Sequence, residues 1–166
     1  MYTEADKLKE NKGLAAIVGS IQAFLLTIVA AFYLLWAGGG TFPFANEQSL
    51  ARSVIGRRGI TRVPSRRAFL YLGVLLLAAA VAAFLMGGFS EAYSKSKMVL
   101  APLGLFLAAV FFARGVAGIL PAFERAAPEQ PFLSLNRRLY SPFCVLIGFG
   151  FLFLVLSLPN WAYRLR

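Results

Sequence analysis

Four long runs of apolar residues alternate with polar connections along this chain. The runs cover residues 13–37, 68–86, 98–120 and 141–158. About 20 helical residues cross the hydrocarbon core of a bilayer, because the core is about 30 Å thick and each residue rises about 1.5 Å. A backbone in lipid must also satisfy its own hydrogen bonds, and these runs lack the alternating pattern of a membrane barrel. The pattern therefore predicts four transmembrane helices.

Local signals at the ends of the runs agree with these boundaries. Ser141 and Pro142 predict an N-cap and a first-turn proline for the fourth helix, and Pro121 predicts the end of the third. Aromatic side chains near the run ends predict the interfacial belt that anchors membrane helices. The belt residues are Trp36, Tyr140, Trp161 and Tyr163.

The connection between the first two runs, residues 38–67, is too long for a simple turn. It contains the segment "NEQSLARSVIG", in which Asn46 can cap a helix and Gly56 can end it. Four apolar residues of this segment share one helical face: Leu50, Ala51, Val54 and Ile55. We predict a short helix that lies on the membrane surface.

Small residues mark the expected contacts between helices, because lipid supplies no hydrophobic drive to bring helices together. The first run carries a stripe at intervals of four: Ala15, Gly19, Ala23, Thr27 and Ala31. The stripes of the other runs include Ala79, Ala83 and Gly87, then Gly104 and Ala108, then Cys144 and Gly148. We therefore predict one all-α domain over residues 1–166: an integral membrane four-helix bundle with a short interfacial helix in its first loop.

Composition supports a chain dissolved in lipid. Hydrophobic residues make up 59% of the 166 residues and charged residues 14%, with a mean hydropathy of +0.70, whereas soluble domains carry about 25% charged residues. The net charge is +10, but the basic residues lie between the apolar runs, where they can meet anionic headgroups. Membrane lipids are therefore expected partners. Nucleic acid is not, because no basic stretch is interleaved with exposed aromatics.

The first connection carries six arginines: Arg52, Arg57, Arg58, Arg62, Arg66 and Arg67. They fit either an ordinary cytoplasmic loop or a specific site for lipid or a partner. The basic residues of the first and third connections favour termini outside the cytoplasm. Lys7, Lys9 and Lys12 beside the first run favour an internal N-terminus, so both orientations stay open.

Residues for chemistry within the membrane are scarce. The chain has no histidine, which excludes a His-ligated haem or chlorophyll and a histidine base from this chain. No Asp or Glu lies within the four runs, and no catalytic or metal-binding motif appears. We therefore predict no catalytic residue and no metal ligand, and favour a protein that is not an enzyme.

Arg114 is a full charge inside an apolar run, "AAVFFARGVAGILP". Its stem can carry the guanidinium back to the headgroups, or the charge can point inward to a carboxylate, carbonyls or a phosphate. Gln22 is expected to form an interhelical hydrogen bond, with a ligand contact as the alternative. If Arg114 holds a ligand or lipid, the candidates to assist it are Trp36, Tyr33, Gln22, Arg57, Arg58, Arg66 and Arg67.

Three segments carry a resemblance to a known family: "YLLWAGGGTFP" (33–43), "FFARGVAGIL" (111–120) and "NRRLYSPFCVLIG" (136–148). The chain resembles, over roughly residues 13–158, a bacterial family of four-span membrane proteins catalogued as domain of unknown function 3995. The resemblance implies the same four-helix bundle and a bacterial inner membrane. It places these residues among the family's recurrent positions: Arg114, Trp36, Gly38, Gly39, Tyr140, Ser141 and Pro142. Family members commonly carry a histidine where this chain has Tyr33.

Two functions follow as hypotheses. The first is a non-catalytic accessory subunit that packs against a larger membrane protein complex and holds lipid or cofactor at the interface. The second is a membrane-embedded enzyme or binding protein for an anionic, lipid-soluble molecule centred on Arg114. The scarcity of chemistry favours the first, and the direction in which Arg114 points discriminates between them.

Overall fold

The computed structural model describes residues 4–63, 65–88 and 97–158, and these residues form helices and loops without a strand. Four helices are long and apolar enough to cross a membrane, so the predicted four-span, all-α architecture is confirmed. Trp161 and Tyr163 of the predicted aromatic belt lie outside the described residues. In chain order the elements are α1 (Glu4–Ala37), α2 (Glu47–Val54), α3 (Arg66–Gly88), α4 (Lys97–Ala117), α5 (Pro121–Ala126), α6 (Phe132–Leu135), the π-helix η1 (Asn136–Tyr140) and α7 (Ser141–Ser157).

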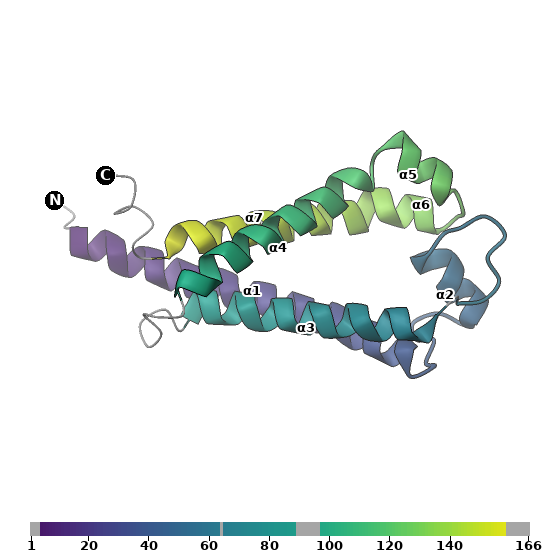
Figure 1. The fold of residues 1–166 in the computed structure, drawn as a ribbon, viewed down its shortest axis with the longest axis horizontal. Helices are drawn as coiled ribbons and strands as arrows, with labels where there is room; N and C mark the ends of the chain where they lie inside the picture. The colour runs from purple at the N-terminus through teal and green to yellow at the C-terminus, as the bar shows by residue number, and fades with distance from the viewer. Residues whose placement is uncertain (1–3, 64, 89–96, 159–166) are drawn as a thin grey trace.

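The four long helices form two pairs. Helix α1 packs along α3, helix α4 packs along α7, and the main contact between the pairs is that of α1 with α7. Figure 1 shows the pairs close together where α1 begins and diverging toward the opposite end, where α2, α5 and α6 lie. We call that opposite end, formed by residues 38–63 and 118–140, the loop end.

The buried face of α1 follows steps of four, three, four and four residues. Ala15, Gly19, Gln22, Leu26 and Ala30 are buried, whereas the last two members of the predicted stripe of four-residue steps, Thr27 and Ala31, are exposed. Four residues turn an α-helix by about 400°, so a strict row of such steps drifts about 40° around the helix at each step. The stripe is therefore wrong for the second half of α1, where the buried positions have shifted by the one three-residue step from Gly19 to Gln22.

Small residues bring the two helices of the first pair into backbone contact. A Cβ atom on Gly19 would lie 2.7 Å from the Ala83 carbonyl oxygen and 2.8 Å from the Gly87 Cα. Ala23, one turn further along α1, is half-buried against the same core. Because backbone atoms cannot move aside as a side chain can, these positions set the separation of α1 and α3.

The second pair uses the same device. A Cβ on Gly104 would lie 2.5 Å from the Val155 Cγ2, and one on Gly148 would lie 3.0 Å from the Phe112 ring. Ala108 is 3% exposed at the same interface. The larger side chains that fill the core between the pairs include Leu26, Met86, Ile147, Phe151, Leu154 and Val155.

The short helix α2 begins and ends at the residues that the sequence indicates. The Asn46 Oδ1 accepts a hydrogen bond from the Ser49 N–H at 2.9 Å, and Gly56 ends the helix with a φ of +68°, which favours glycine. Its apolar face meets protein, because Leu50 is 2% exposed and packs with Trp36 and Phe69. The predicted short helix is therefore present in the first loop, and its apolar face packs on the first helix pair.

Two helix ends differ from the prediction. Helix α4 ends at Ala117, and Pro121 begins α5 instead of stopping the third span, because Leu120 is extended and the proline ring suits a first helical turn. Ser141 is not an N-cap: its φ and ψ of −67° and −48° are helical, and helix continues from Phe132 to Ser157.

A π-turn explains how Pro142 fits inside this continuous helix. The Ser141 N–H donates to the Asn136 carbonyl, five residues earlier, so the helix is wider here than an α-helix. A proline has no N–H and its ring clashes with the carbonyl four residues before it in a regular α-helix. The wider turn relieves this conflict one residue before the proline.

The close approach of α1 and α3 predicts a position-specific effect of side-chain volume. Gly19→Val should lower the free energy of unfolding by about 1–3 kcal/mol, because overpacking of a tight contact costs about that much. Equilibrium unfolding in mixtures of dodecylmaltoside and SDS, followed by circular dichroism, measures this change. The control is Gly13→Val on the same helix, where a Cβ meets nothing within 4 Å. Equal losses at the two positions would contradict the assignment of Gly19 to the helix contact.

Candidate functional site

Arg114 points into the protein at the loop end of α4. Its Nη2 donates a hydrogen bond to the Asn136 Oδ1 at 3.1 Å, and its Cζ lies 5.0 Å from the centroid of the Phe123 ring. The guanidinium therefore contacts η1 and α5 of the same chain. Its place in the last turn of α4 also sets the positive charge beside the negative end of the helix dipole.

Asn136 is the polar centre of this site and is 0% exposed. Its Oδ1 accepts from Arg114 and, at 3.4 Å, from the Ser141 hydroxyl, while its Nδ2 donates to the Gly118 carbonyl. Asn136 and Ser141 are five residues apart in the sequence, and the π-turn brings their side chains to the same side of the helix. Gly118 completes the arrangement, because a Cβ there would lie 2.7 Å from the Arg114 Nη1.

One donor of this site has no acceptor. The Arg114 Nη1 is buried and makes no hydrogen bond to any described residue. Arg137 forms an ion pair with Glu124. Arg114 forms none with the described residues. A buried donor without a partner lowers stability by about 1–3 kcal/mol, and by more when it is charged. An acceptor beside this atom would remove that cost, and the described residues supply none.

Tyr33, another residue that the sequence singled out, packs within the first helix pair. Its ring is edge-on to Phe69 at a centroid distance of 5.7 Å and tilted against Trp36 at 5.2 Å. Among the described residues no hydrogen bond joins Tyr33 to Arg114, whose acceptor is Asn136.

The other predicted residues have different surroundings. The Gln22 Nε2 donates to the Ile147 carbonyl at 3.3 Å, which is the interhelical hydrogen bond expected of it. The Trp36 Nε1 donates to the Phe42 carbonyl at 2.9 Å, so its polar atom is already used within the first pair. Four arginines that the sequence singled out are exposed and make no described contact with Arg114: Arg57 and Arg58 at the loop end, and Arg66 and Arg67 at the start of α3.

Asn136 is the residue that sequence reasoning missed, although it opens the segment "NRRLYSPFCVLIG". A usable signal exists: no carboxylate lies within the four runs, so an inward arginine requires a neutral acceptor, and amides are the natural candidates. A metal site has no support within the described residues, where no group of three His, Cys, Asp or Glu side chains could hold an ion.

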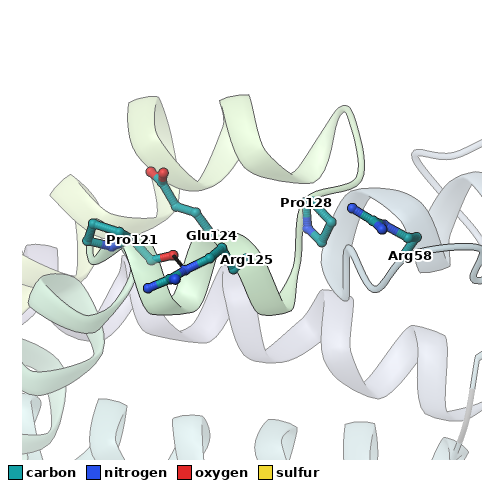
Figure 2. A pocket seen from close by; sticks show the side chains of 5 residues that line it. All are labelled: Arg58, Pro121, Glu124, Arg125 and Pro128. Carbon is teal, nitrogen blue, oxygen red and sulfur yellow. Dashed lines mark hydrogen bonds between the residues drawn. The ribbon is translucent and has the colours of Figure 1, made fainter.

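A second feature of the loop end is an open surface depression of about 610 Å³. It is lined by Arg58, Pro121, Glu124, Arg125 and Pro128, which Figure 2 shows from close by. The Glu124 carboxylate accepts two hydrogen bonds from Arg137, at 2.5 and 2.6 Å. These bonds hold the pKa of the Glu124 carboxyl below its ordinary value.

The chain matches the model of a family described as "Protein of unknown function (DUF3995)" over residues 26–151. Because this match covers most of the chain, the protein belongs to that family. The Arg114 site lies within the matched range, with Tyr33, Asn136 and Cys144. No curated protein matches the chain, and no solved structure matches it either.

The hydrogen bond of Arg114 to Asn136 predicts an energetic coupling. Asn136→Leu should lower the free energy of unfolding by about 1–3 kcal/mol, because Arg114 and the Gly118 carbonyl both lose a partner. The loss should be smaller when Arg114→Met is already present, because one of the two orphaned groups is then gone. Unfolding of the two single variants and the double variant in SDS mixtures measures the coupling, and additive losses would contradict it.

The pairing of Glu124 with Arg137 predicts a change in titration. Arg137→Gln should raise the pKa of the Glu124 carboxyl toward its ordinary value, because the two hydrogen bonds favour the charged form. Carboxyl ¹³C chemical shifts across a pH series measure this pKa. The control is Arg138→Gln, the neighbouring exposed arginine, which should leave the pKa of Glu124 where it is. An unchanged titration in Arg137→Gln would contradict the pairing.

Proposed function

We propose that this chain is a non-catalytic membrane protein that binds one anionic amphiphile through Arg114. The observation that carries the proposal is the buried Arg114 Nη1, which has no acceptor among the described residues. A charged group left unpaired at membrane depth is costly, and charged residues at such depth commonly mark binding sites. An acidic headgroup that enters from the lipid phase supplies both the missing acceptor and the missing negative charge.

The geometry of the guanidinium restricts the chemistry of the ligand. The Nη2 nitrogen is used by Asn136, and one face of the guanidinium plane lies over the Phe123 ring. The free Nη1 therefore suits a single oxygen of a carboxylate or phosphate. Arg114 as a whole is half-buried but its Nη1 is buried, so a ligand must displace neighbouring side chains to reach this atom.

Binding without catalysis fits the composition of the site. The chain has no histidine, and the carboxylates of the described loop end are used elsewhere: Glu124 by Arg137, Glu129 by the Gly59 N–H and Glu47 by the Val63 N–H. Arg114 cannot serve as a general base because a guanidinium keeps its proton in proteins. The residues around it support retention of an anion and offer no evident route for proton transfer.

The role of an accessory subunit stays a prediction beside this proposal. No more than 39% of any membrane-spanning window is buried inside the chain, so each helix has outward surface for lipid or for another subunit. A bacterial inner membrane is the expected location from the family resemblance. Recovery of another polypeptide with the chain after mild solubilisation would support the accessory role, and recovery of the chain alone would count against it.

Retention of oleate, a long-chain carboxylate, tests the proposal directly. The purified chain in mild detergent should retain one radiolabelled oleate through gel filtration. Arg114→Gln should weaken retention by about tenfold or more, because a hydrogen bond to a charged group contributes about 1.5–3 kcal/mol. Arg138→Gln, a change at an exposed arginine of the same end, should leave retention as it is.

A second variant keeps the test independent of folding defects. Asn136→Asp places a carboxylate beside Arg114 inside the protein, and it should therefore displace oleate while the helical content stays the same. Oleyl alcohol, which has the same chain without the charge, should compete poorly. Unchanged oleate retention in Arg114→Gln, or equal binding of the alcohol, would overturn the proposal.

A further inference from the structure

We propose a second, separate site at the loop end: the surface depression beside α5 binds the headgroup of an anionic phospholipid. This site shares no residue with the Arg114 site. Its lining residues come from two connections of the chain, with Arg58 from the loop after α2 and the others from α5 and the residue pair that follows it. A volume of about 610 Å³ is ample for a glycerophosphate headgroup.

The depression carries uncompensated positive charge. Arg58 and Arg125 both line it and are exposed, and neither pairs with a carboxylate among the described residues. The carboxylate of Glu124 is bound by Arg137, and Figure 2 shows it directed away from Arg125 and Arg58. Two arginines that line the depression thus have no carboxylate partner among the described residues, which favours a phosphate.

Both arginines are held in place by the fold. The Arg125 Nε donates to the Pro121 carbonyl at 3.2 Å, so the side chain lies back along α5 and keeps its two terminal nitrogens for another acceptor. Arg58 is positioned by its neighbours. The Gly59 N–H donates to the Glu129 carboxylate at 2.9 Å, and the Glu129 N–H donates to the Gly56 carbonyl at 3.1 Å.

These bonds tie the loop after α2 to the connection that follows α5. They set Arg58 beside Pro128, as Figure 2 shows, and so make the depression from segments about seventy residues apart in the chain. Prior ordering of this kind lowers the entropy cost of binding, which an arginine on a free loop would have to meet in full.

The exposed apolar surface of α4 favours a lipid as the ligand. Phe106 and Val110 are 63% and 46% exposed, and Leu120, 48% exposed, directly precedes Pro121. The part of α4 from Phe106 to Ala117 is about 17 Å long, comparable to much of an acyl chain. A phospholipid can therefore lay its chain along α4 and place its phosphate at the depression that the two arginines line, at the height of the interface.

This binding also orients the protein. An anionic phospholipid held at the loop end places residues 38–63 and 118–140 in the leaflet that carries anionic lipid, whose negative surface potential attracts arginine. The orientation left open by the sequence then follows from a specific contact. The termini would lie on the opposite side of the membrane.

Native mass spectrometry of the full chain, released from nanodiscs of phosphatidylglycerol and phosphatidylcholine, tests the site. The expected result is preferential retention of one phosphatidylglycerol. Arg58→Gln or Arg125→Gln should weaken this retention by about fivefold each, since a basic residue at an anionic membrane surface contributes about 1 kcal/mol. The double variant should approach the retention of phosphatidylcholine. Both arginines are exposed, so the variants should fold as the parent chain does.

A matched variant shows whether retention depends on this depression or on positive charge elsewhere at the loop end. Arg138→Gln removes an exposed charge of the same end outside the depression and should leave retention as it is. Oleate retention should stay as it is in the Arg58 and Arg125 variants, which distinguishes this site from the proposed function. Retention that is insensitive to the Arg58 and Arg125 variants, that falls equally in Arg138→Gln, or that is as strong for phosphatidylcholine would overturn the inference.

Discussion

The fold depends on direct contact between helix backbones. In lipid, apolar side chains gain nothing by leaving one apolar environment for another, so helices associate where their surfaces fit closely. Gly19 and Gly87 meet in this way between α1 and α3, and a Cβ on Gly115 would lie 3.1 Å from the Ser141 carbonyl oxygen between α4 and α7. These contacts lie within each helix pair, where contact is most extensive, and the pairs themselves meet less fully. The pairs diverge at the loop end because contact between the pairs is less extensive than contact within each pair.

At the loop end, where the two helix pairs diverge, polar contacts connect them. The Tyr140 hydroxyl donates to the Ser53 carbonyl at 3.1 Å, and Gly56 packs against Phe132. Together with the bonds of Glu129, these contacts connect the first pair, through α2, to the second pair, through η1. The polar residues of the loop end therefore have a structural task, and Arg114 and the surface depression lie beside the segments that perform it.

The π-turn connects the position of Pro142 in the sequence with the polar contacts of Arg114. Pro142 requires a local departure from the α-helix, and the departure found here moves Asn136 to the same side as Ser141. That movement supplies an amide oxygen to Arg114 at 3.1 Å. The two anion sites are thus different in kind. The interior site offers one nitrogen in a low dielectric, whereas the surface site offers two arginines to a hydrated headgroup.

The four membrane spans, the helix α2 with its Asn46 cap and Gly56 end, and the contact roles of Gly19, Gly104 and Gly148 could be read from the sequence. Each depends on local chemistry: hydrophobic length, a side chain bonding its own backbone, or the lack of a Cβ. The continuation of helix through Ser141 could not be read in this way, because Ser141 followed by Pro142 has the local pattern of a helix start.

The direction of Arg114 was decided only by the tertiary structure. Its acceptor lies 22 residues away on a turn whose width depends on a proline, and its aromatic neighbour belongs to a short helix between them. The sequence determined that a charge sits at this depth. Which way the charge points depends on the neighbours that packing brings to it, and a linear pattern carries no record of those distances.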